Sequence, residues 1–356
     1  MTRLESILAK NKLVKEDLHF LLSLRDPFEI NTLFTKAYEV KKEHVGLVVY
    51  YRGLIELSNI CCKDCYYCGI RKSNSSVERY TASKEEIISA CRWAFDQGYG
   101  SVVLQSGENT SPSFINFISG LLTEIKRISD NKLGITLSLG EQSRDVYKTW
   151  RDCGAHRYLL RIETSNPDLY KTLHPSDHSF QKRLDCLKFL RELNYQVGTG
   201  VMIGLPGQTI DDLVNDILFY EKMDIDMIGM GPYIPHQQTP LSQKSAEINT
   251  DDNFMSALKM IACTRIYLKD INIAAATALQ AITHDGREQG IKAGANIIMP
   301  NLTDLNYRRG YQLYDNKPCM DENASMCREC LSRRIGGMGE EIGYYRWGDS
   351  PHALKR

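Results

Sequence analysis

The chain lacks an excess of charge of either sign. Its 44 Lys and Arg residues are balanced by 44 Asp and Glu residues among 356 residues. A balanced chain has no long-range field that would attract nucleic acid or an anionic membrane. We therefore expect its partner to be a small molecule or another protein, with no nucleic acid and no membrane involved.

Long apolar runs are also missing. No uninterrupted apolar stretch approaches the roughly 18 residues that a membrane-spanning helix needs. The opening stretch, MTRLESILAKNKLVKEDLHF, mixes acidic and basic side chains and lacks the apolar core of a signal peptide. These absences predict a cytoplasmic protein.

Cysteine, by contrast, is present in an odd number, 11. In a reducing compartment this argues against a disulfide framework and favours metal binding or catalysis. Six cysteines fall into two groups, one early and one late: Cys61, Cys65 and Cys68, then Cys319, Cys327 and Cys330. We interpret the isolated ones as small buried apolar residues: Cys91, Cys153, Cys186 and Cys263.

Along the chain, a polar helical segment is followed by eight apolar, strand-length runs that alternate with helical patterns. The runs span residues 47–57, 100–106, 134–140, 157–164, 196–204, 226–233, 272–279 and 294–300. This alternation is typical of an α/β fold, and we predict a (β/α)8 TIM barrel rather than a doubly wound sheet of similar period. We expect the barrel over residues 46–310, an N-terminal helical extension over 1–45, and a C-terminal segment over 311–356 that carries the second cysteine group.

The first cysteine group lies in the sequence CCKDCYYCG, with the spacing C-x3-C-x2-C, directly after the first run. In a parallel barrel this is the end of the strands where active sites form. Cys61, Cys65 and Cys68 could hold three irons of a [4Fe–4S] cube and leave one iron open. Adjacent side chains in an extended segment point opposite ways, so we expect Cys62 to turn away and pack against the barrel.

Zinc is the alternative metal. The pairs Cys65-x2-Cys68 and Cys327-x2-Cys330 could together supply four thiolates. However, they are ~260 residues apart, against roughly 15–20 in a zinc ribbon. Cys61 and Cys319 would also have no role. We therefore favour an iron–sulfur cluster.

The cysteine motif, with Tyr67 directly before its last cysteine, resembles the signature of radical S-adenosylmethionine (radical SAM) enzymes. Further segments resemble the [FeFe]-hydrogenase maturases of the HydE family, in a branch that also contains biotin synthase and methylornithine synthase (PylB). These segments are IELSNICCKDCYYCGIRKSN, VVLQSGE, TLSLGE, RYLLRIETSNP, GLPGQT, GMGPYIPHQQTPL and ANIIMPN. The cysteine motif alone indicates the superfamily, whereas the linked set indicates this branch.

The resemblance implies that S-adenosyl-L-methionine (SAM) binds the open iron and is cleaved to a 5′-deoxyadenosyl radical. It implies that Ser106, Gly107 and Glu108 receive the amino group, that Glu163 holds the ribose hydroxyls or the amine, that Arg183 holds the carboxylate, and that Tyr67 and Leu205 contact SAM. Without the resemblance, Glu163 would be read as a salt-bridge partner of Arg161, and Arg183 as an exposed helix residue.

For the substrate, the resemblance implies a pocket inside the barrel formed by Thr136, Arg157, Arg161, Thr277, Tyr311 and Tyr314. Two arginines in one barrel favour an anionic ligand, such as a carboxylate or a cyanide-bearing iron complex. Met227 and Met299 could line the same cavity. The chain departs from its relatives at Ile162, where some carry histidine, and at Ala276, where a threonine is expected.

The second cysteine group, Cys319-x7-Cys327-x2-Cys330, resembles an accessory site of some HydE proteins. This implies a second cluster, [2Fe–2S] or [4Fe–4S]; thiols that stay reduced or bind zinc adventitiously are the alternative.

Taken together, the resemblance implies maturation of the di-iron subsite of the hydrogenase H-cluster, on a substrate of the Fe(CO)2(CN)–cysteine type. HydG- and HydF-like maturases and an electron donor are the implied partners. A methylornithine synthase-like lysine mutase is the alternative enzyme, and biotin synthase is disfavoured because its second set of cluster cysteines cannot be placed. A non-enzymatic metal carrier would have little need for Glu108, Glu163 and Arg183.

Overall fold

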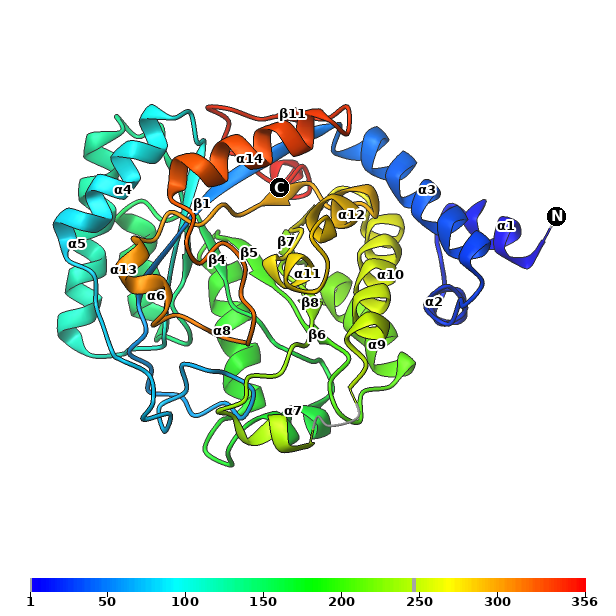
Figure 1. Cartoon of the computed structure of the whole chain (residues 1–356), viewed down its shortest axis with the longest axis horizontal. Coiled ribbons are helices and arrows are strands. Elements are labelled where there is room, and N and C mark those ends of the chain that lie inside the picture. The colour runs from blue at the N-terminus through cyan, green and yellow to red at the C-terminus, as the bar shows by residue number, and fades with distance from the viewer. Residues whose placement is uncertain (1, 245–247) are drawn as a thin grey trace.

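The N-terminal region forms three helices that extend from one side of the molecule (Figure 1). The computed structural model describes residues 2–244 and 248–356. The helices are α1 (Arg3–Leu8), α2 (Lys15–Leu22) and α3 (Pro27–His44). The Asp26 side chain caps α3 by accepting the backbone N–H groups of Phe28 and Glu29, both at 3.0 Å. Helices α2 and α3 pack against α10 on the barrel wall.

Eight strands form a closed parallel ring, which confirms the predicted barrel. In ring order they are β10 (Ile297–Ile298), β1 (Val48–Ser58), β2 (Ser101–Ser106), β3 (Gly134–Ser138), β4 (Arg157–Leu159), β5 (Gln196–Thr199), β7 (Met227–Ile228) and β9 (Asn272–Ile273). The ring closes where Ala274 bridges Ile297 and the Ala275 N–H donates to the Ile297 carbonyl at 2.9 Å. A further short strand, β11 (Glu341–Ile342), extends the sheet beside the start of β1.

Five of the eight predicted runs are strands over only part of their length, and the fourth and eighth contain only the short β4 and β10. The fifth and sixth break after β5 and β7 and resume as β6 (Met202–Ile203) and β8 (Gly231–Pro232), which pair only with each other. Gly200 and Gly229 approach so closely at the break that a Cβ on Gly200 would lie 2.0 Å from the Gly229 carbonyl oxygen. The seventh run was wrongly extended to residue 279. Helix α11 (Thr277–Ile282) begins there, because the alanine-rich sequence AAATAL favours a helix over a strand.

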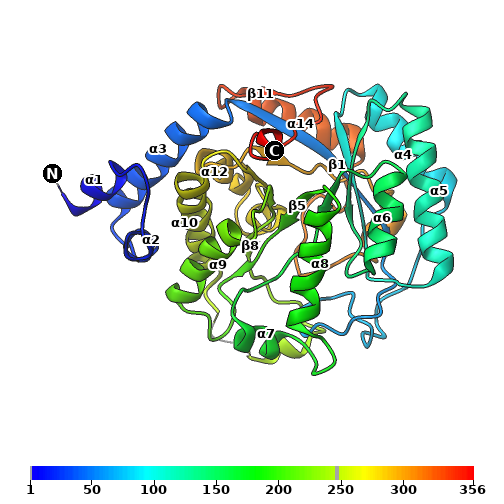
Figure 2. The same ribbon diagram turned by 180° about the vertical axis from the view of Figure 1, so that it is seen from behind.

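Helices cover the outside of the ring, as Figure 2 shows from behind. They are α4 (Lys84–Asp96), α5 (Pro112–Ile128), α6 (Arg144–Asp152), α7 (Pro167–Leu173), α8 (Phe180–Glu192), α9 (Ile210–Lys222), α10 (Thr250–Leu268), α12 (Gly286–Lys292), α13 (Leu305–Arg308) and α14 (Ala324–Gly336), with 3-10 turns η1 (Pro240–Lys244) and η2 (Ala353–Lys355). Ser83 and Glu86 form the expected capping box on α4. None of the helices in the described ranges is both long and apolar enough to cross a membrane.

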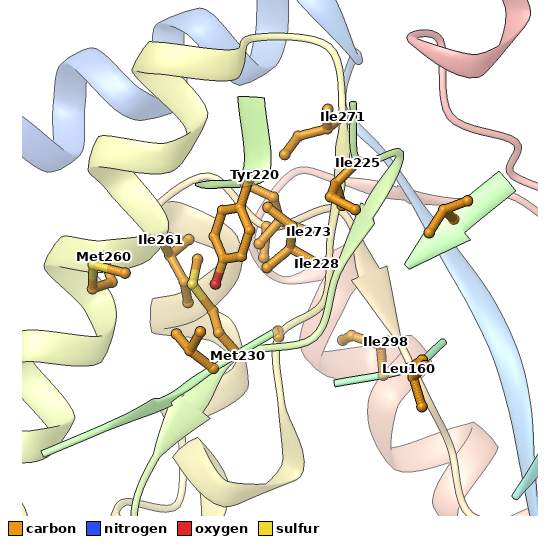
Figure 3. Close-up of a cluster of buried hydrophobic side chains, with 14 of the residues drawn as sticks. Leu160, Tyr220, Ile225, Ile228, Met230, Met260, Ile261, Ile271, Ile273 and Ile298 are labelled. Carbon is orange, nitrogen blue, oxygen red and sulfur yellow. The ribbon is translucent and has the colours of Figure 1, made fainter. Parts of the chain in front are cut away.

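The main core lies between the outer faces of the strands and the helices. Figure 3 shows Tyr220 from α9 and Ile261 from α10 next to Ile228 of β7 and Ile273 of β9. All four side chains are buried. Because this packing encloses the ring from outside, the barrel interior is free to carry polar groups.

The two ends of the barrel differ. The end at which the strands begin is closed by the C-terminal tail, where the Gly348 carbonyl accepts hydrogen bonds from Arg52 Nη2 (3.0 Å) and Asn272 Nδ2 (2.9 Å). The loops after β1 and β2 lie at the opposite end, toward the bottom of Figure 1. A site at that end can therefore be reached only from the loop side.

Candidate active site

The cysteine loop follows β1 at the end of the barrel where the strands finish. Cys61 Sγ accepts the backbone N–H of Glu108 at 3.3 Å, which joins the loop to the end of β2. Desolvation raises the pKa of Cys65 to about 12, and that of Cys68 rises for the same reason, with Cys65 and Cys61 adding to it. Three thiols crowded in this way are stabilised as thiolates only by a cationic group such as a metal centre.

The spacing of these thiols fits a cluster better than a single ion. Within the described residues, only Cys319, Glu322 and Cys327 have ligand atoms that all lie within 4.8 Å of one another. The three thiols of the first group do not all lie within this distance of one another, which leaves room for a centre larger than one ion. The cysteine pairs proposed for a shared zinc site are not brought together. The structure therefore disfavours the zinc alternative.

Cys62 does not pack against the barrel, so that expectation was wrong. Its side chain is exposed, although its backbone N–H donates to the Glu108 carbonyl at 2.8 Å. The backbone tie holds the residue at the barrel rim, and the thiol extends into solvent, 3.8 Å from Glu108 Oε1.

Ser106, Gly107 and Glu108 lie directly against the cysteine loop. A Cβ on Gly107 would be 2.4 Å from the Ile60 carbonyl oxygen and 2.7 Å from Cys61 Cβ, so only glycine allows this approach. The Glu108 carboxylate is buried and accepts the backbone N–H of Glu141 at 2.8 Å. Burial raises the pKa of Glu108, with the Glu141 carboxylate adding to the rise.

Glu163 follows β4 in a left-handed backbone conformation, with φ of +66°. Such a conformation is costly for a side chain larger than glycine and is concentrated at functional sites. The expected salt bridge with Arg161 is present at 3.0 Å, and Tyr67 also donates to the Glu163 carboxylate at 3.4 Å. Tyr67 thus joins the cysteine loop to the end of β4, while Leu205 packs beside it in a separate apolar cluster.

Arg183 is buried, and the alternative reading of an exposed helix residue is wrong. Its Nε donates to Glu141 Oε1 at 2.7 Å and its Nη1 donates to the Arg161 carbonyl at 2.8 Å. The protein therefore fixes two nitrogens of the guanidinium, and within the described part of the chain Nη2 makes no hydrogen bond and could meet a ligand. A carboxylate is the natural partner for such a group.

Sequence reasoning missed Lys63 and Glu141. Lys63 Nζ lies 2.9 Å from Glu141 Oε2 and 3.5 Å from Glu108 Oε1. Burial alone would raise the pKa of Glu141, but Arg183 and then Lys63 outweigh it and lower the pKa to about 2. The available signal was the position of Glu141 in TLSLGE, just after a buried strand, as Glu108 is in VVLQSGE.

The predicted substrate residues divide between the two ends of the barrel. Arg157 begins β4 and lies at the closed end, where Nη1 contacts Asp349 at 2.6 Å and Nε donates to Thr136 Oγ1 at 3.0 Å. Arg161 lies two residues after the end of β4, at the loop end of the barrel, with its side chain 35% exposed. Arg157 and Thr136 are thus engaged with the C-terminal tail and with each other, apart from Arg161.

Of the two predicted tyrosines, Tyr314 lies near Arg161, and Tyr311 lies near Lys317 and Glu56. Burial raises the pKa of Tyr314, which the nearby Arg287 and then Arg161 counteract. Thr277 begins α11 and accepts a hydrogen bond from Arg287 at 3.4 Å. Tyr311 is buried, and its ring lies 5.3 Å from the ammonium of Lys317. Lys317 in turn contacts Glu56 of β1 at 2.5 Å, an inward pair that the sequence reasoning also missed.

The second cysteine group lies beside α14. Cys327 and Cys330 are one turn apart on that helix, and Cys319 lies in the preceding loop with φ of +61°. A hydrogen bond with Cys319 lowers the pKa of Cys327 and raises that of Cys319. The three thiols and Glu322 line a cavity of about 360 Å³ with Gln280, His284 and Arg334.

Comparisons with known proteins agree with this geometry. Residues 55–220 match the family described as the radical SAM superfamily. The chain is 44% identical over 337 residues to the [FeFe] hydrogenase maturase subunit HydE of Thermotoga maritima, covering 94% of each chain. It is 28% identical over 339 residues to 3-methylornithine synthase of Methanosarcina acetivorans, covering 95% of this chain and 92% of that one. The crystal structure of methylornithine synthase (PylB) has a TM-score of 0.82 at 24% identity, covering 97% and 98%, and shares the fold.

Proposed function

Because the chain belongs to the radical SAM superfamily and, within it, to the family of the [FeFe] hydrogenase maturase subunit HydE, we propose that it acts in assembly of the di-iron subsite of the hydrogenase H-cluster. It is a radical SAM enzyme, and its family implies a [4Fe–4S] cluster and SAM as cofactors. The single observation that carries the proposal is the 44% identity to HydE across 94% of both chains.

The residues at the loop end fit these cofactors. Cys61, Cys65 and Cys68 would hold the cluster, since their thiols are spaced for more than one iron. When bound, the cluster supplies the electron that cleaves SAM to the 5′-deoxyadenosyl radical. The free nitrogen of Arg183 would bind the SAM carboxylate, and its other two nitrogens are already fixed by the protein.

The remaining SAM contacts follow from the same arrangement. Ser106, Gly107 and Glu108 would receive the amino group beside the cysteine loop, which Gly107 allows to approach. Glu163 would hold the ribose hydroxyls or the amine, with Tyr67 fixing its carboxylate. Leu205 would form an apolar wall beside adenine. Carboxylates suit these roles because they accept charge-assisted hydrogen bonds.

For the substrate, the proposal is an anionic iron complex of the Fe(CO)2(CN)–cysteine type. Arg161 supports this, because its side chain is partly open and its Nε has no hydrogen-bond partner within the described residues. Thr277, Tyr311 and Tyr314 would complete the pocket at this end. Arg157 and Thr136, bound to the tail and to each other, would shape its floor.

The wider assignments are also proposals. HydG- and HydF-like maturases and an electron donor would be the partners, in the cytoplasm. Cys319, Cys327 and Cys330 would hold a second cluster, [2Fe–2S] or [4Fe–4S], supported by the cavity they line. The chain would divide into the extension (residues 1–45), the barrel (46–310) and a C-terminal segment (311–356) that carries this site and closes the barrel floor.

The test is in vitro maturation. The reconstituted protein should release 5′-deoxyadenosine from SAM and dithionite, and a hydrogenase matured with HydG and HydF should become active only when the chain is added. No 5′-deoxyadenosine would overturn the enzyme assignment. Formation of 3-methylornithine from lysine, detected by mass spectrometry, would instead support the lysine mutase.

A further inference from the structure

We propose that Glu141 is the positioning residue of the SAM site: it fixes the guanidinium of Arg183 and ties it to the cysteine loop through Lys63. The inference rests on the proposed binding of SAM by Arg183, and it assigns a role to a residue that contacts neither the cluster thiols nor the reacting atoms.

The first support is the position of Glu141 between two cations. The residue directly follows the turn at Gly140, after β3, and its side chain is fully buried. Oε1 accepts from Arg183 Nε at 2.7 Å and Oε2 accepts from Lys63 Nζ at 2.9 Å. Each carboxylate oxygen therefore accepts a hydrogen bond from one cation, while the exposed ammonium of Lys182 lies farther off, 3.7 Å from Oε2. Lys63 lies between two of the proposed cluster-binding cysteines in the sequence.

The second support is the convergence of three separate parts of the barrel. The backbone N–H of Glu141 donates to the Glu108 carboxylate at 2.8 Å, so the loop after β2 is included. Lys63 brings the cysteine loop and Arg183 brings α8. No other carboxylate among the described residues connects Lys63 with Arg183. A displacement of Glu141 would thus act on the cysteine loop, the loop after β2 and α8, three of the elements that are proposed to contact SAM.

The third support is the orientation that results for Arg183. A planar guanidinium held at Nε and Nη1 can rotate little, so its remaining nitrogen is presented in a fixed direction. Without the Glu141 carboxylate, Arg183 would lose its charge-assisted hydrogen bond and keep the bond to the Arg161 carbonyl. Lys63 would be left with Glu108 at 3.5 Å. The loss would therefore act on the orientation of Arg183 rather than on the thiols.

A general structural role makes a different prediction, and the chain contains a matched control. Glu340 and Lys41 also form a fully buried pair, at 2.6 Å, where α3 meets the segment before β11. Removing one partner of a buried pair destabilises a protein wherever the pair lies. The variants Glu141→Gln and Glu340→Gln should therefore both lower thermal stability, and only the first should change SAM binding.

The experiment measures SAM binding by the change in the EPR spectrum of the reduced cluster as SAM is added, together with KM and kcat for 5′-deoxyadenosine formation. We expect Glu141→Gln to keep its cluster iron and to raise the SAM concentration for half-maximal spectral change and the KM by ~10–100-fold, as for other outer-sphere partners. The kcat at saturating SAM should fall less. Glu340→Gln should match the wild type in both readouts.

An unchanged SAM titration in Glu141→Gln, or the same shift in Glu340→Gln, would overturn the inference. If Glu141→Gln fails to hold its cluster, the variant Glu141→Asp is measured instead. Aspartate keeps the charge but is too short to hold both cations. A KM for SAM between those of the wild type and a full loss supports the role, and a wild-type KM overturns it. Failure of the proposed function is distinct, because the wild-type protein itself would then show no spectral response to SAM.

Discussion

The two cysteine groups have the same residue type, yet their surroundings differ. The first loop is tied to distant parts of the chain: Lys63 contacts Glu141, and the Asp64 N–H donates to His178 at 3.1 Å. The second group is built locally, from one turn of α14 and the loop before it. Among the charged groups beside it is Glu322, whose carboxylate lies within 4.8 Å of two of the thiols.

This difference supports the proposal that the first group carries the chemistry. A site that holds a reacting cofactor needs groups from several elements to orient it, and the first group has them. The second has a compact donor set and a cavity, which suffice to hold a metal centre but offer no arrangement for SAM. The spacing C-x3-C-x2-C already distinguishes the first group from the C-x7-C-x2-C of the second, and the long-range contacts add a structural difference.

We expect the largest loss of activity when a cysteine of the first group is removed. Cys65→Ala should remove a cluster ligand and lower 5′-deoxyadenosine formation by more than ~100-fold. Cys330→Ala, its counterpart in the second group, should stay within about twofold of the wild type, because no proposed SAM contact lies near it. Both are measured by chromatography of the product after reduction. An equal loss of 5′-deoxyadenosine formation in the two variants would contradict the different roles proposed for the two cysteine groups.

A second effect concerns Asp216, a buried carboxylate on α9 that accepts the Ser165 N–H at 2.6 Å next to the Glu163 loop. Burial raises its pKa from 3.8 to about 7. For an acid whose pKa is raised on folding, ionisation costs stability, so the free energy of unfolding falls as pH rises from about 4 to about 7, by up to about 4 kcal/mol.

The variant Asp216→Asn keeps an acceptor for Ser165 and cannot ionise. We expect it to be more stable than the wild type at pH 8 and to differ less at pH 5.5, as measured by denaturant unfolding. A wild-type stability that is the same at both values, or a variant that is less stable at pH 8, would contradict the assignment of this pKa.

A third prediction tests whether Arg183 on α8 contributes to SAM binding at the first site. Arg183→Met should raise the KM for SAM by ~10–100-fold, since a charge-assisted hydrogen bond contributes about 1.5–3 kcal/mol. Lys188→Met, on the same helix at a 55% exposed residue that pairs with Asp185, is the control and should leave the KM unchanged. If the two variants behave alike, a general loss of positive charge explains the result, and Arg183 has no specific role.

The smallest effect on catalysis is expected at Glu322. Glu322→Gln should lower the iron content attributable to the second site. It should leave 5′-deoxyadenosine formation within about twofold, because within the described residues Glu322 contacts no residue that is proposed to bind SAM. Iron analysis and product assay on the same sample measure both quantities. Reduced product at unchanged iron would mean that the second group takes part in the chemistry.

The sequence was sufficient to predict the barrel and the position of the three thiols of the first loop at the end of the strands. Both rest on local patterns, which are strand-length apolar runs and the spacing of cysteines. It could not show Glu141 or Lys63, whose roles depend on elements ~40–80 residues apart meeting at one point. The same holds for Arg157. Its inward position was predictable, but its ion pair with Asp349 requires the C-terminal tail to return beneath the barrel.

Two local predictions failed for local reasons. Residues 277–279 form a helix because alanine favours it once the chain leaves the sheet. Cys62 is exposed at the barrel rim, with its backbone N–H on the Glu108 carbonyl and its thiol 3.8 Å from Glu108 Oε1. In both cases the alternation of a strand was extended beyond its end, which is Ser58 for β1 and Ile273 for β9.

In the proposed arrangement, SAM binds at the first cysteine group and not at the second. The direct measurement is electron–nuclear double resonance on the reduced protein with SAM labelled by ¹⁵N at its amino group. We predict a strong nitrogen coupling in the wild type that is retained when Cys319, Cys327 and Cys330 are all replaced by serine. The absence of coupling in the wild type, or its loss in the serine variant, would contradict the account.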